Sequence, residues 1–286
     1  MSAPTPLQEE QSRHEAPLQM RVTRIAPESR PPRVLQRMLA LEDFEPEARR
    51  ILPRPIYGYV AGGTETDAAL RGNRSVFDEL SFVPRVLVNT AARDGRVSLF
   101  GRTYQAPFGI APMGGTSLGC FRGDEVLARV AGEANIPMIM SGAALTPLEK
   151  VRAAGRTAWF QAYLPGDDAR IPALVQRVQR AGYDTLVLTV DVPVGANREN
   201  NVRNGYSAPL RPTARLAWET LKRPRWLAKT ALRTLLAQGM PHYENMGDRV
   251  PLVSRKLQRR REGRGSSAWC FRRFILSRNS MLWRTC

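Results

Sequence analysis

Cysteine and histidine are scarce in this chain. It has three cysteines, Cys120, Cys270 and Cys286, and two histidines, His14 and His242, among 286 residues. Three widely spaced cysteines provide neither a disulfide framework nor a CxxC metal pair, which predicts a reducing, cytoplasmic location and no metal site. Two distant histidines likewise argue against a histidine-rich metal centre.

Long apolar runs are also missing. No run of about 18 apolar residues occurs, which argues against a transmembrane helix. The first twenty residues lack the basic-then-apolar pattern of a secretory signal. Apolar residues nevertheless make up 43% of the chain, which is enough for a sizeable core and excludes wholesale disorder.

Acidic residues are few, with 26 Asp and Glu against 43 Lys and Arg, a formal net charge of +17. Residues 255–286 hold ten basic residues and one acid (+9), and residues 211–240 hold seven and one (+6). The remainder is close to neutral. A charge confined to two segments does not predict a DNA-binding face spread over a fold, so nucleic acid is disfavoured as a partner.

The N-terminal third has little strand character. Residues 1–35 predict a mobile arm. A helical pattern covers 42–60, broken by Pro53 and Pro55, and a second covers 67–80. Residues 97–104 predict a hairpin that turns near Gly101.

From residue 108 onward, strand-like runs alternate with helical stretches. The strands are 108–111, 137–140, 158–163 and 185–190, and the helices are 123–134, 147–154 and 168–181. Thr146-Pro147 and Asp167/Asp168 offer N-cap chemistry for the last two helices. The alternation predicts a parallel sheet, either a (β/α)₈ barrel or a doubly wound sheet.

Two features favour the barrel. The first turn, APMGGTSLG, lacks the GxGxxG spacing of a dinucleotide-binding sheet. Polar side chains also stand at successive strand ends, where a barrel builds its active site. These residues are Ser141, Gln161, Tyr163, Thr189 and Asp191.

Six separated motifs follow one another between residues 53 and 199, within a stretch of resemblance that runs from about residue 35 to about residue 253. They are PRPIYGYVAGGT (53–64), IAP (110–112), MSG (140–142), WFQAY (159–163), LTVD (188–191) and NRE (197–199). In order and spacing they resemble the FMN-dependent α-hydroxy-acid dehydrogenases and oxidases, which include glycolate oxidase, flavin-linked lactate dehydrogenase and mandelate dehydrogenase. The resemblance implies a TIM-type (β/α)₈ barrel, an FMN cofactor, a homo-oligomer, and oxidation of a small 2-hydroxy acid to a 2-oxo acid.

The resemblance also implies roles for individual residues. Backbone at Pro112, Met113 and Gly114 would approach the flavin near N5. The side chains of Ser141, Gln161 and Thr189 would hydrogen-bond the edges of the flavin ring.

On the substrate side, Tyr59, Tyr163 and Arg198 would bind the 2-hydroxy acid, because a guanidinium suits a carboxylate. Tyr163 and Asp191 would be catalytic residues, Asp191 by supporting a histidine base.

The resemblance ends after about four β/α units. The family's Lys-Gly strand end, its SNHGGR motif with the catalytic histidine, and its late phosphate-binding glycine and arginine motifs have no counterpart. Neither histidine of the chain substitutes for the missing base. The sequence therefore predicts an incomplete barrel that is inactive in this form.

Five segments result: a mobile arm (1–35), a helical cap with a β-hairpin (36–106), the first half of an FMN-type barrel (107–204), a basic amphipathic insertion (205–253) and an aberrant basic tail (254–286). Within the insertion, residues 211–240 mix Trp218, Leu221, Trp226, Leu227 and further leucines with basic residues. This mixture suits a helix on an anionic membrane surface, and equally a helical flap with a solvated basic face.

The tail is interpreted as a frameshifted reading, with a genuine basic tail as the alternative. Two other function classes stay open for the chain: a catalytically dead gene fragment, and a basic module that binds membrane or nucleic acid. The predicted location is the cytoplasm, with peripheral attachment to the inner face of the cell membrane as a further option. The sequence leaves open the substrate side chain, the electron acceptor and the oligomeric state.

Overall fold

The computed structural model describes residues 32–156, 158–164, 168–190, 196–246 and 250–253. The first described elements are two short 3₁₀ turns, η1 (Leu35–Arg37) and η2 (Leu41–Asp43), followed by helices α2 (Phe44–Ile51) and α3 (Arg54–Ala61). The predicted break is confirmed: Leu52 is extended and Pro53 is the N-cap of α3. Proline suits this position because the first helical turn needs no N–H from it.

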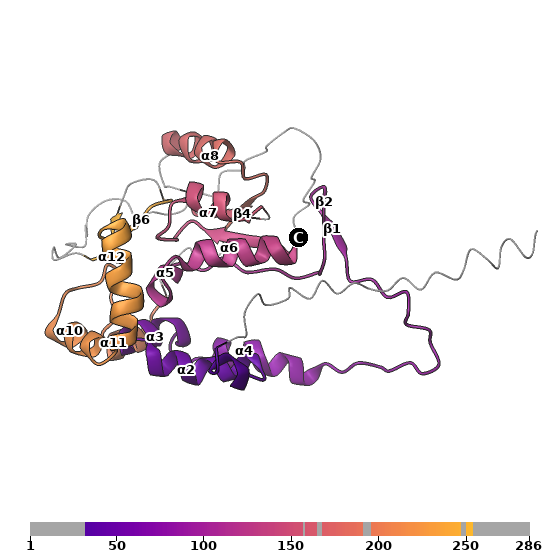
Figure 1. Ribbon diagram of the computed structural model, residues 1–286, viewed down its shortest axis with the longest axis horizontal. Coiled ribbons are helices and arrows are strands. Elements are labelled where there is room, and N and C mark those ends of the chain that lie inside the picture. Colours follow the sequence, from indigo (N-terminus) through magenta and orange to yellow (C-terminus); the bar gives the residue numbers. More distant parts are fainter. Residues whose placement is uncertain (1–31, 157, 165–167, 191–195, 247–249, 254–286) are drawn as a thin grey trace, which may run out of the picture.

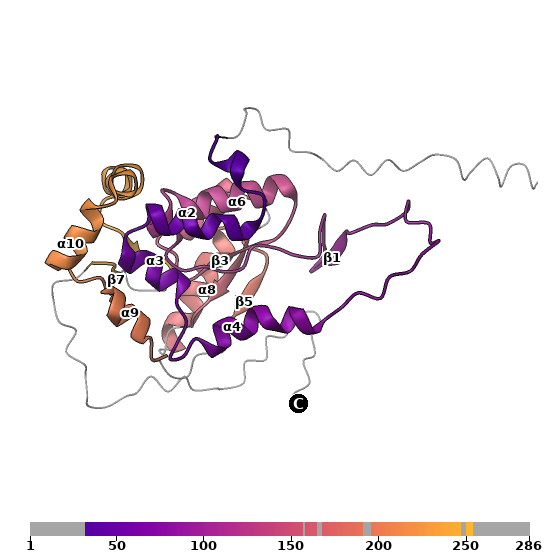
Figure 2. The same cartoon turned by 90° about the horizontal axis from the view of Figure 1, so that it is seen from below.

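The second predicted helix is also present. It consists of α4 (Ala68–Ser75) and the 3₁₀ turn η3 (Val76–Glu79). The segment between η3 and β1 then runs out from the rest of the described chain as an extended connection (Figures 1 and 2). Large apolar side chains of this connection lie almost wholly in solvent, notably Phe82 and Leu87.

The hairpin prediction is confirmed. Strand β1 (Val97–Leu99) pairs antiparallel with β2 (Arg102–Tyr104), with Val97 opposite Tyr104. Gly101 takes a φ of +78° in the turn, a conformation that glycine adopts without steric cost. The Trp159 indole donates to the Tyr104 hydroxyl at 3.0 Å, so the hairpin is attached to the main sheet.

The main sheet is parallel, as predicted, in the order β3-β4-β5. Its strands are β3 (Met138–Ser141), β4 (Ala158–Ala162) and β5 (Leu186–Leu188). The predicted strand at 108–111 is wrong in extent, because only an isolated bridge from Ile110 to Met138 forms there. Pro107 and Pro112 enclose this run and carry no N–H for a ladder.

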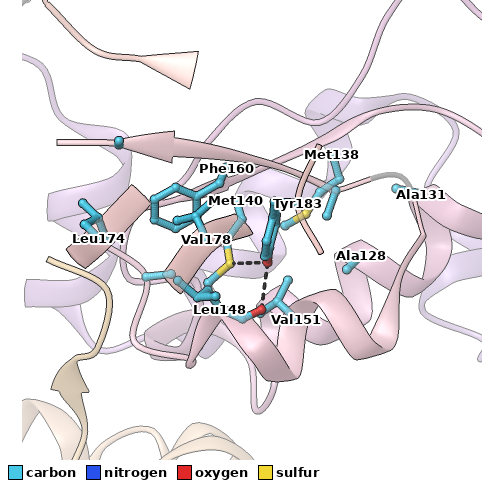
Figure 3. Close-up of a cluster of buried hydrophobic side chains, with 13 residues drawn as sticks. Ala128, Ala131, Met138, Met140, Leu148, Val151, Phe160, Leu174, Val178 and Tyr183 are labelled. Atoms are coloured by element: carbon cyan, nitrogen blue, oxygen red, sulfur yellow. Dashed lines mark hydrogen bonds between the residues drawn. The ribbon is translucent and has the colours of Figure 1, made fainter. Parts of the chain in front are cut away.

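Helix α6 (Gly123–Ala134) precedes β3, α7 (Leu148–Ala154) follows β3, and α8 (Ile171–Arg180) follows β4 after the 3₁₀ turn η4 (Asp168–Arg170). Their apolar faces form one core with the sheet (Figure 3), in which Met140, Leu148, Val151 and Phe160 are fully buried. The Tyr183 hydroxyl donates to the carbonyl oxygen of Leu148 at 2.8 Å, which satisfies its polar atom inside this core.

The predicted Thr146 cap of α7 is wrong. Pro147 is the N-cap of α7, and the Thr146 hydroxyl donates instead to the Asp124 carboxylate at 2.9 Å. Arg170 is the N-cap of α8. Asp167 lies outside the described residues. An N-cap side chain must accept from a backbone N–H of the helix, and at the start of α7 the Asn245 side-chain oxygen accepts from the Leu148 N–H at 3.0 Å instead.

The remaining elements are α9 (Glu199–Asn204), α10 (Ala214–Leu221), α11 (Pro224–Trp226), a π-helical turn η5 (Leu227–Leu232) and α12 (Arg233–Gln238). Strands β6 (His242–Tyr243) and β7 (Val250–Pro251) then form a short antiparallel pair. A second apolar cluster joins this region to α3 and α5 (Thr116–Gly119) through Ile56, Leu118, Tyr206, Trp226 and Leu252. The region therefore belongs to the folded body, beside α5 and α3 in Figure 1.

Candidate functional site

Three polar side chains line up across the carboxyl ends of the parallel strands. The Ser141 hydroxyl donates to the Gln161 carboxamide oxygen at 3.1 Å, and the Gln161 amide nitrogen donates to the Thr189 hydroxyl oxygen at 2.6 Å. The backbone N–H of Gly142 also donates to the Gln161 oxygen, at 3.3 Å. Ser141 and Gln161 are buried, and Thr189 is half-buried. The structure thus brings together the three residues predicted to contact the flavin ring.

The predicted flavin-facing backbone, residues 112–114, is exposed. A Cβ on Gly114 would meet the Cβ of Ala143 at 3.1 Å, so this loop lies directly against the turn after β3. The Thr116 hydroxyl donates to the Met113 carbonyl oxygen at 3.1 Å. The loop is therefore tied to α5 at one end and faces the Ser141 turn at the other.

A separate aromatic group surrounds Arg198, just before α9. The Arg198 guanidinium lies 5.8 Å from the centre of the Tyr59 ring. The Tyr59 ring in turn stacks on Tyr206, with centroids 4.2 Å apart and ring planes 13° apart. Two residues predicted to bind substrate are thus neighbours.

Sequence reasoning missed Tyr206. It is buried, and desolvation raises the pKa of its phenol far above the usual value. The feature of the sequence that could have indicated it is an aromatic residue seven positions after the NRE motif. Tyr206 extends the group to a layered Arg198–Tyr59–Tyr206 arrangement.

The other predicted site residues are placed less fully. Tyr163 is half-buried and directly follows β4. Asp191 and His14 lie outside the described residues, and His242 is a half-buried residue of β6.

Asp124 is a second residue that sequence reasoning missed. It lies in the first turn of α6, is only 2% exposed, and accepts from Thr146 and, at 3.4 Å, from the Ser117 hydroxyl. Burial raises the pKa of its carboxyl group, and the hydroxyl donors oppose that rise in part. Asp124 thereby links α5 to the turn after β3, the two segments that border the predicted flavin site.

Within the described ranges, no group of three or more His, Cys, Asp or Glu side chains is arranged to hold a metal ion. No helix in the same ranges has the length and apolar character needed to cross a bilayer.

Residues 48–269 match the model of the FMN-dependent dehydrogenase family. The match continues past Val253 into the segment predicted as an aberrant tail. Similar curated proteins include 4-hydroxymandelate oxidase of Amycolatopsis orientalis (34% identical over 171 residues, 60% of this chain and 48% of the relative). L-lactate dehydrogenase of Pseudomonas entomophila is 33% identical over 204 residues, 71% of this chain and 52% of the relative.

Solved structures agree. A crystal structure of the monotopic membrane protein (S)-mandelate dehydrogenase superposes with a TM-score of 0.65 at 30% identity, covering 71% of this chain and 53% of that one. A mandelate oxidase superposes with a TM-score of 0.57 at 34% identity, covering 59% of this chain and 50% of that one. The chain thus spans about half the length of these relatives. It belongs to the FMN-dependent dehydrogenase family.

Proposed function

We propose that this chain is the first half of an FMN-type β/α barrel, of the kind that oxidises a 2-hydroxy acid to a 2-oxo acid. The observation that carries the proposal is the hydrogen-bonded row Ser141–Gln161–Thr189 across three adjacent parallel strands. An α/β barrel places its cofactor at this end of its strands. The relatives named for lactate and mandelate supply the substrate class.

The row fits the edge of a flavin ring. Gln161 uses its oxygen and one amide proton within the row, and no described residue accepts its second amide proton. The Thr189 oxygen accepts from Gln161, which leaves its own hydroxyl proton free to donate. These two donors suit the carbonyl oxygens and nitrogens of an isoalloxazine edge.

The loop at 112–114 supplies the other wall. It presents exposed backbone with a glycine at its closest approach to the Ser141 turn. A Cβ on Gly114 would lie 3.1 Å from the Cβ of Ala143, so a larger residue would require the loop or the Ser141 turn to shift. This loop is therefore suited to lie against a flat ring.

Flavin, when bound, would accept the hydride equivalent removed from the substrate α-carbon. Arg198 would hold the substrate carboxylate through two parallel N–H donors. Tyr59, oriented by its stack on Tyr206, would help Arg198 to hold the carboxylate, and Tyr163 would also bind the substrate. Asp191, as the matched carboxylate, would orient a histidine base.

Neither the histidine nor the phosphate site matches any part of this sequence. The chain has only His14 and His242, and both lie outside the matched motifs. In such barrels the phosphate site follows strands seven and eight. We therefore propose that this chain alone binds the flavin ring weakly and does not turn over a hydroxy acid.

A flavin titration tests the proposal. FMN and lumiflavin, which has no phosphate, are titrated against the protein by flavin fluorescence. Both should bind with similar affinity, because only the ring is recognised. Gln161→Leu should weaken binding about two- to tenfold, the worth of one or two hydrogen bonds. Gln176→Leu, an exposed glutamine of α8, is the matched control. Failure of wild type to bind either flavin, or equal binding by Gln161→Leu, would count against the proposal.

A second function is favoured by the exposed face of α10–α12. Trp218, Leu221 and Leu236 are 60%, 62% and 82% exposed. The Lys222 ammonium lies 5.1 Å from the Trp218 ring. Apolar and cationic side chains on one surface suit the interface of an anionic bilayer, and a related structure is named a monotopic membrane protein. We propose that this face attaches the protein peripherally to a cytoplasmic membrane surface.

A further inference from the structure

Trp226 does not belong to the exposed face of the helical region 214–238. The sequence pattern grouped it with Trp218 and Leu221 as a candidate lipid-facing residue, but it is only 8% exposed. Its indole N–H donates to the backbone carbonyl oxygen of Leu118 at 2.7 Å, across 108 residues of sequence. The apolar ring joins Ile56, Leu118 and Tyr206 in a buried cluster. Trp226 therefore lies on the inward face of the segment, together with the buried Thr230 and Thr234.

The group that receives this hydrogen bond lies next to the flavin-facing loop. Leu118 is in α5, which begins immediately after residues 112–115. The Leu118 N–H donates to Gly115 at 2.8 Å, and the Thr116 hydroxyl donates to the Met113 carbonyl oxygen. A helix of four residues leaves most of its carbonyl groups without helical partners. In α5 the Thr116 carbonyl accepts from the Cys120 N–H, whereas the Leu118 carbonyl lies in the last turn. The Trp226 indole satisfies the Leu118 carbonyl in a buried place, where an unpaired carbonyl is costly.

Two further contacts join the same region to this side of the sheet. The Arg233 guanidinium lies 4.6 Å from the centre of the Phe121 ring, just after α5. Asn245, which is 1% exposed, accepts from the Leu148 N–H at 3.0 Å. Its amide group donates to the carbonyl oxygens of Ala144 and Thr146, in the turn after Ser141. Residues 226–245 thus hold both segments that border the row at the strand ends.

We propose that Trp226 is a positioning residue of the cofactor site. By holding α5 through the Leu118 carbonyl, it fixes the loop at 112–115 at the distance a flat ring requires. The apolar and basic helices of residues 214–238 would then support the cofactor site from their buried side, in addition to the membrane contact proposed for their exposed side. The loop-holding role stands on the contacts themselves, whereas its meaning for flavin rests on the proposed function.

Hydrogen–deuterium exchange measures the loop-holding role without any ligand. Trp226→Phe keeps a ring and removes the donor. Exchange in a peptide covering 112–122 should rise about two- to tenfold, the change expected when one hydrogen bond that resists local opening is lost. Exchange of α8 (Ile171–Arg180) should stay unchanged. Trp218→Phe, the same change at an exposed position of α10, should leave both peptides unchanged.

A flavin readout separates positioning from general destabilisation. Val178→Ala shortens a buried side chain of α8 that lies in the sheet core, away from α5. At matched loss of stability, Trp226→Phe should weaken lumiflavin binding several-fold more than Val178→Ala. If wild type binds no flavin, the proposed function fails, and the exchange experiment still decides whether Trp226 holds the loop.

The outcomes that overturn the proposal are equally definite. Unchanged exchange at 112–122 in a Trp226→Phe protein that keeps α8 protected would show that Trp226 does not hold the loop. If Trp226→Phe also loses protection in α8, Trp226→His, which keeps a ring N–H, is compared with it. Loss of α8 protection in both variants would show that Trp226 supports the whole sheet and is no specific positioning residue. Restored protection in Trp226→His alone would support the proposal.

Discussion

Ser141 and Gln161 stand directly opposite each other in the register of β3 and β4, and the serine hydroxyl donates to the glutamine oxygen. This bond, with that from the Gly142 N–H, fixes which end of the carboxamide faces β3. The amide nitrogen consequently points toward Thr189. One serine therefore determines the direction in which the row presents its donors.

Ser141→Ala is expected to loosen this orientation. The Gln161 oxygen would then accept only from the Gly142 N–H, at 3.3 Å. The hydrogen bond that the Ala143 N–H donates to the Ser141 hydroxyl oxygen would also be lost. We expect the free energy of unfolding to fall by about 1–2 kcal/mol, measured by urea denaturation. Ser98→Ala, at a hydroxyl on the exposed β1–β2 hairpin, is the control and should change it by less than about 0.5 kcal/mol. An unchanged Ser141→Ala protein would contradict the assigned role.

Asp124 is expected to make the protein less stable as the pH rises. Its pKa is raised in the folded state, so the folded chain binds the proton more tightly than the unfolded chain, whose reference value is 3.8. The resulting stabilisation is complete below about pH 4 and is lost as the pH rises through the folded pKa. Asp124→Asn cannot titrate. The difference in unfolding free energy, wild type minus Asp124→Asn, should therefore decrease from pH 4 toward pH 7.

Glu149 provides a control of opposite sign. Its hydrogen bonds from Arg177 lower its pKa in the folded state. Its contribution is therefore present above the unfolded value of 4.5 and is lost as the pH falls. Relative to Glu149→Gln, the wild type should gain stability with rising pH. Parallel slopes for the two variants would contradict the assignment of Asp124.

Strand β5 is expected to drive self-association. Within the described residues it pairs only with β4, and Leu186 and Leu188 are 39% and 48% exposed. An unpaired apolar edge invites pairing, and salt of about 0.15 M screens the opposing positive charge beyond about 8 Å. Sedimentation velocity should show oligomers of wild type at this salt. The double variant Leu186→Lys, Leu188→Lys should be mainly monomeric.

Leu39→Lys, at a fully solvated apolar position, is the matched control and should behave as wild type. A monodisperse wild-type monomer with a cooperative melt would instead indicate that the sheet is sufficient by itself.

Vesicle binding is expected to depend on the exposed face of α10–α12. Replacing both Trp218 and Leu236 with Ala removes two large side chains, each worth about 1.5–3 kcal/mol when fully buried. Partitioning onto vesicles with anionic lipid should fall at least tenfold in a sedimentation assay. Leu80→Ala is the control, because Leu80 is likewise exposed (69%) but lies outside α10–α12. Equal partitioning of both proteins would place the membrane contact elsewhere.

The chain alone is expected to show no dye-coupled oxidation of lactate, glycolate or mandelate above background. A positioned base contributes about 10²–10⁴ in rate, and neither His14 nor His242 falls in a matched motif. Measurable turnover that disappears in Arg198→Ala would show that another group serves as the base.

The sequence predicted the parts of the fold that depend on local patterns. The break at Pro53, the turn at Gly101 and the parallel order of the three main strands all follow from nearby residues, whereas Pro55 lies inside the first turn of α3 and does not break it. The extent of the strand at 108–111 was wrong because a strand needs partners, and its pairing here is limited to Ile110.

Contacts between distant residues were the part that could not be predicted. Thr146-Pro147 is a good N-cap sequence, yet the side-chain oxygen of Asn245, 97 residues farther along the chain, accepts from the first N–H of α7. Trp226 fits an amphipathic pattern, yet a carbonyl of α5 takes its indole. In both cases a tertiary partner outweighs the local preference, and no periodicity records that partner. The row at the strand ends was predictable because parallel strands bring their carboxyl ends to one edge.

The Leu148–Asn245 hydrogen bond has a consequence for synthesis. It supplies the first N–H of α7 with an acceptor that lies 97 residues farther along the chain. At about 5–20 residues per second on the ribosome, α7 is made roughly 5–20 seconds before its buried partner exists. During that interval the first N–H of α7 must be hydrogen-bonded by water. The turn after Ser141 also lacks the hydrogen bonds that Asn245 donates to the carbonyl oxygens of Ala144 and Thr146. The cofactor end of the sheet is therefore completed only after residue 245 has left the ribosome, later than the core beneath it.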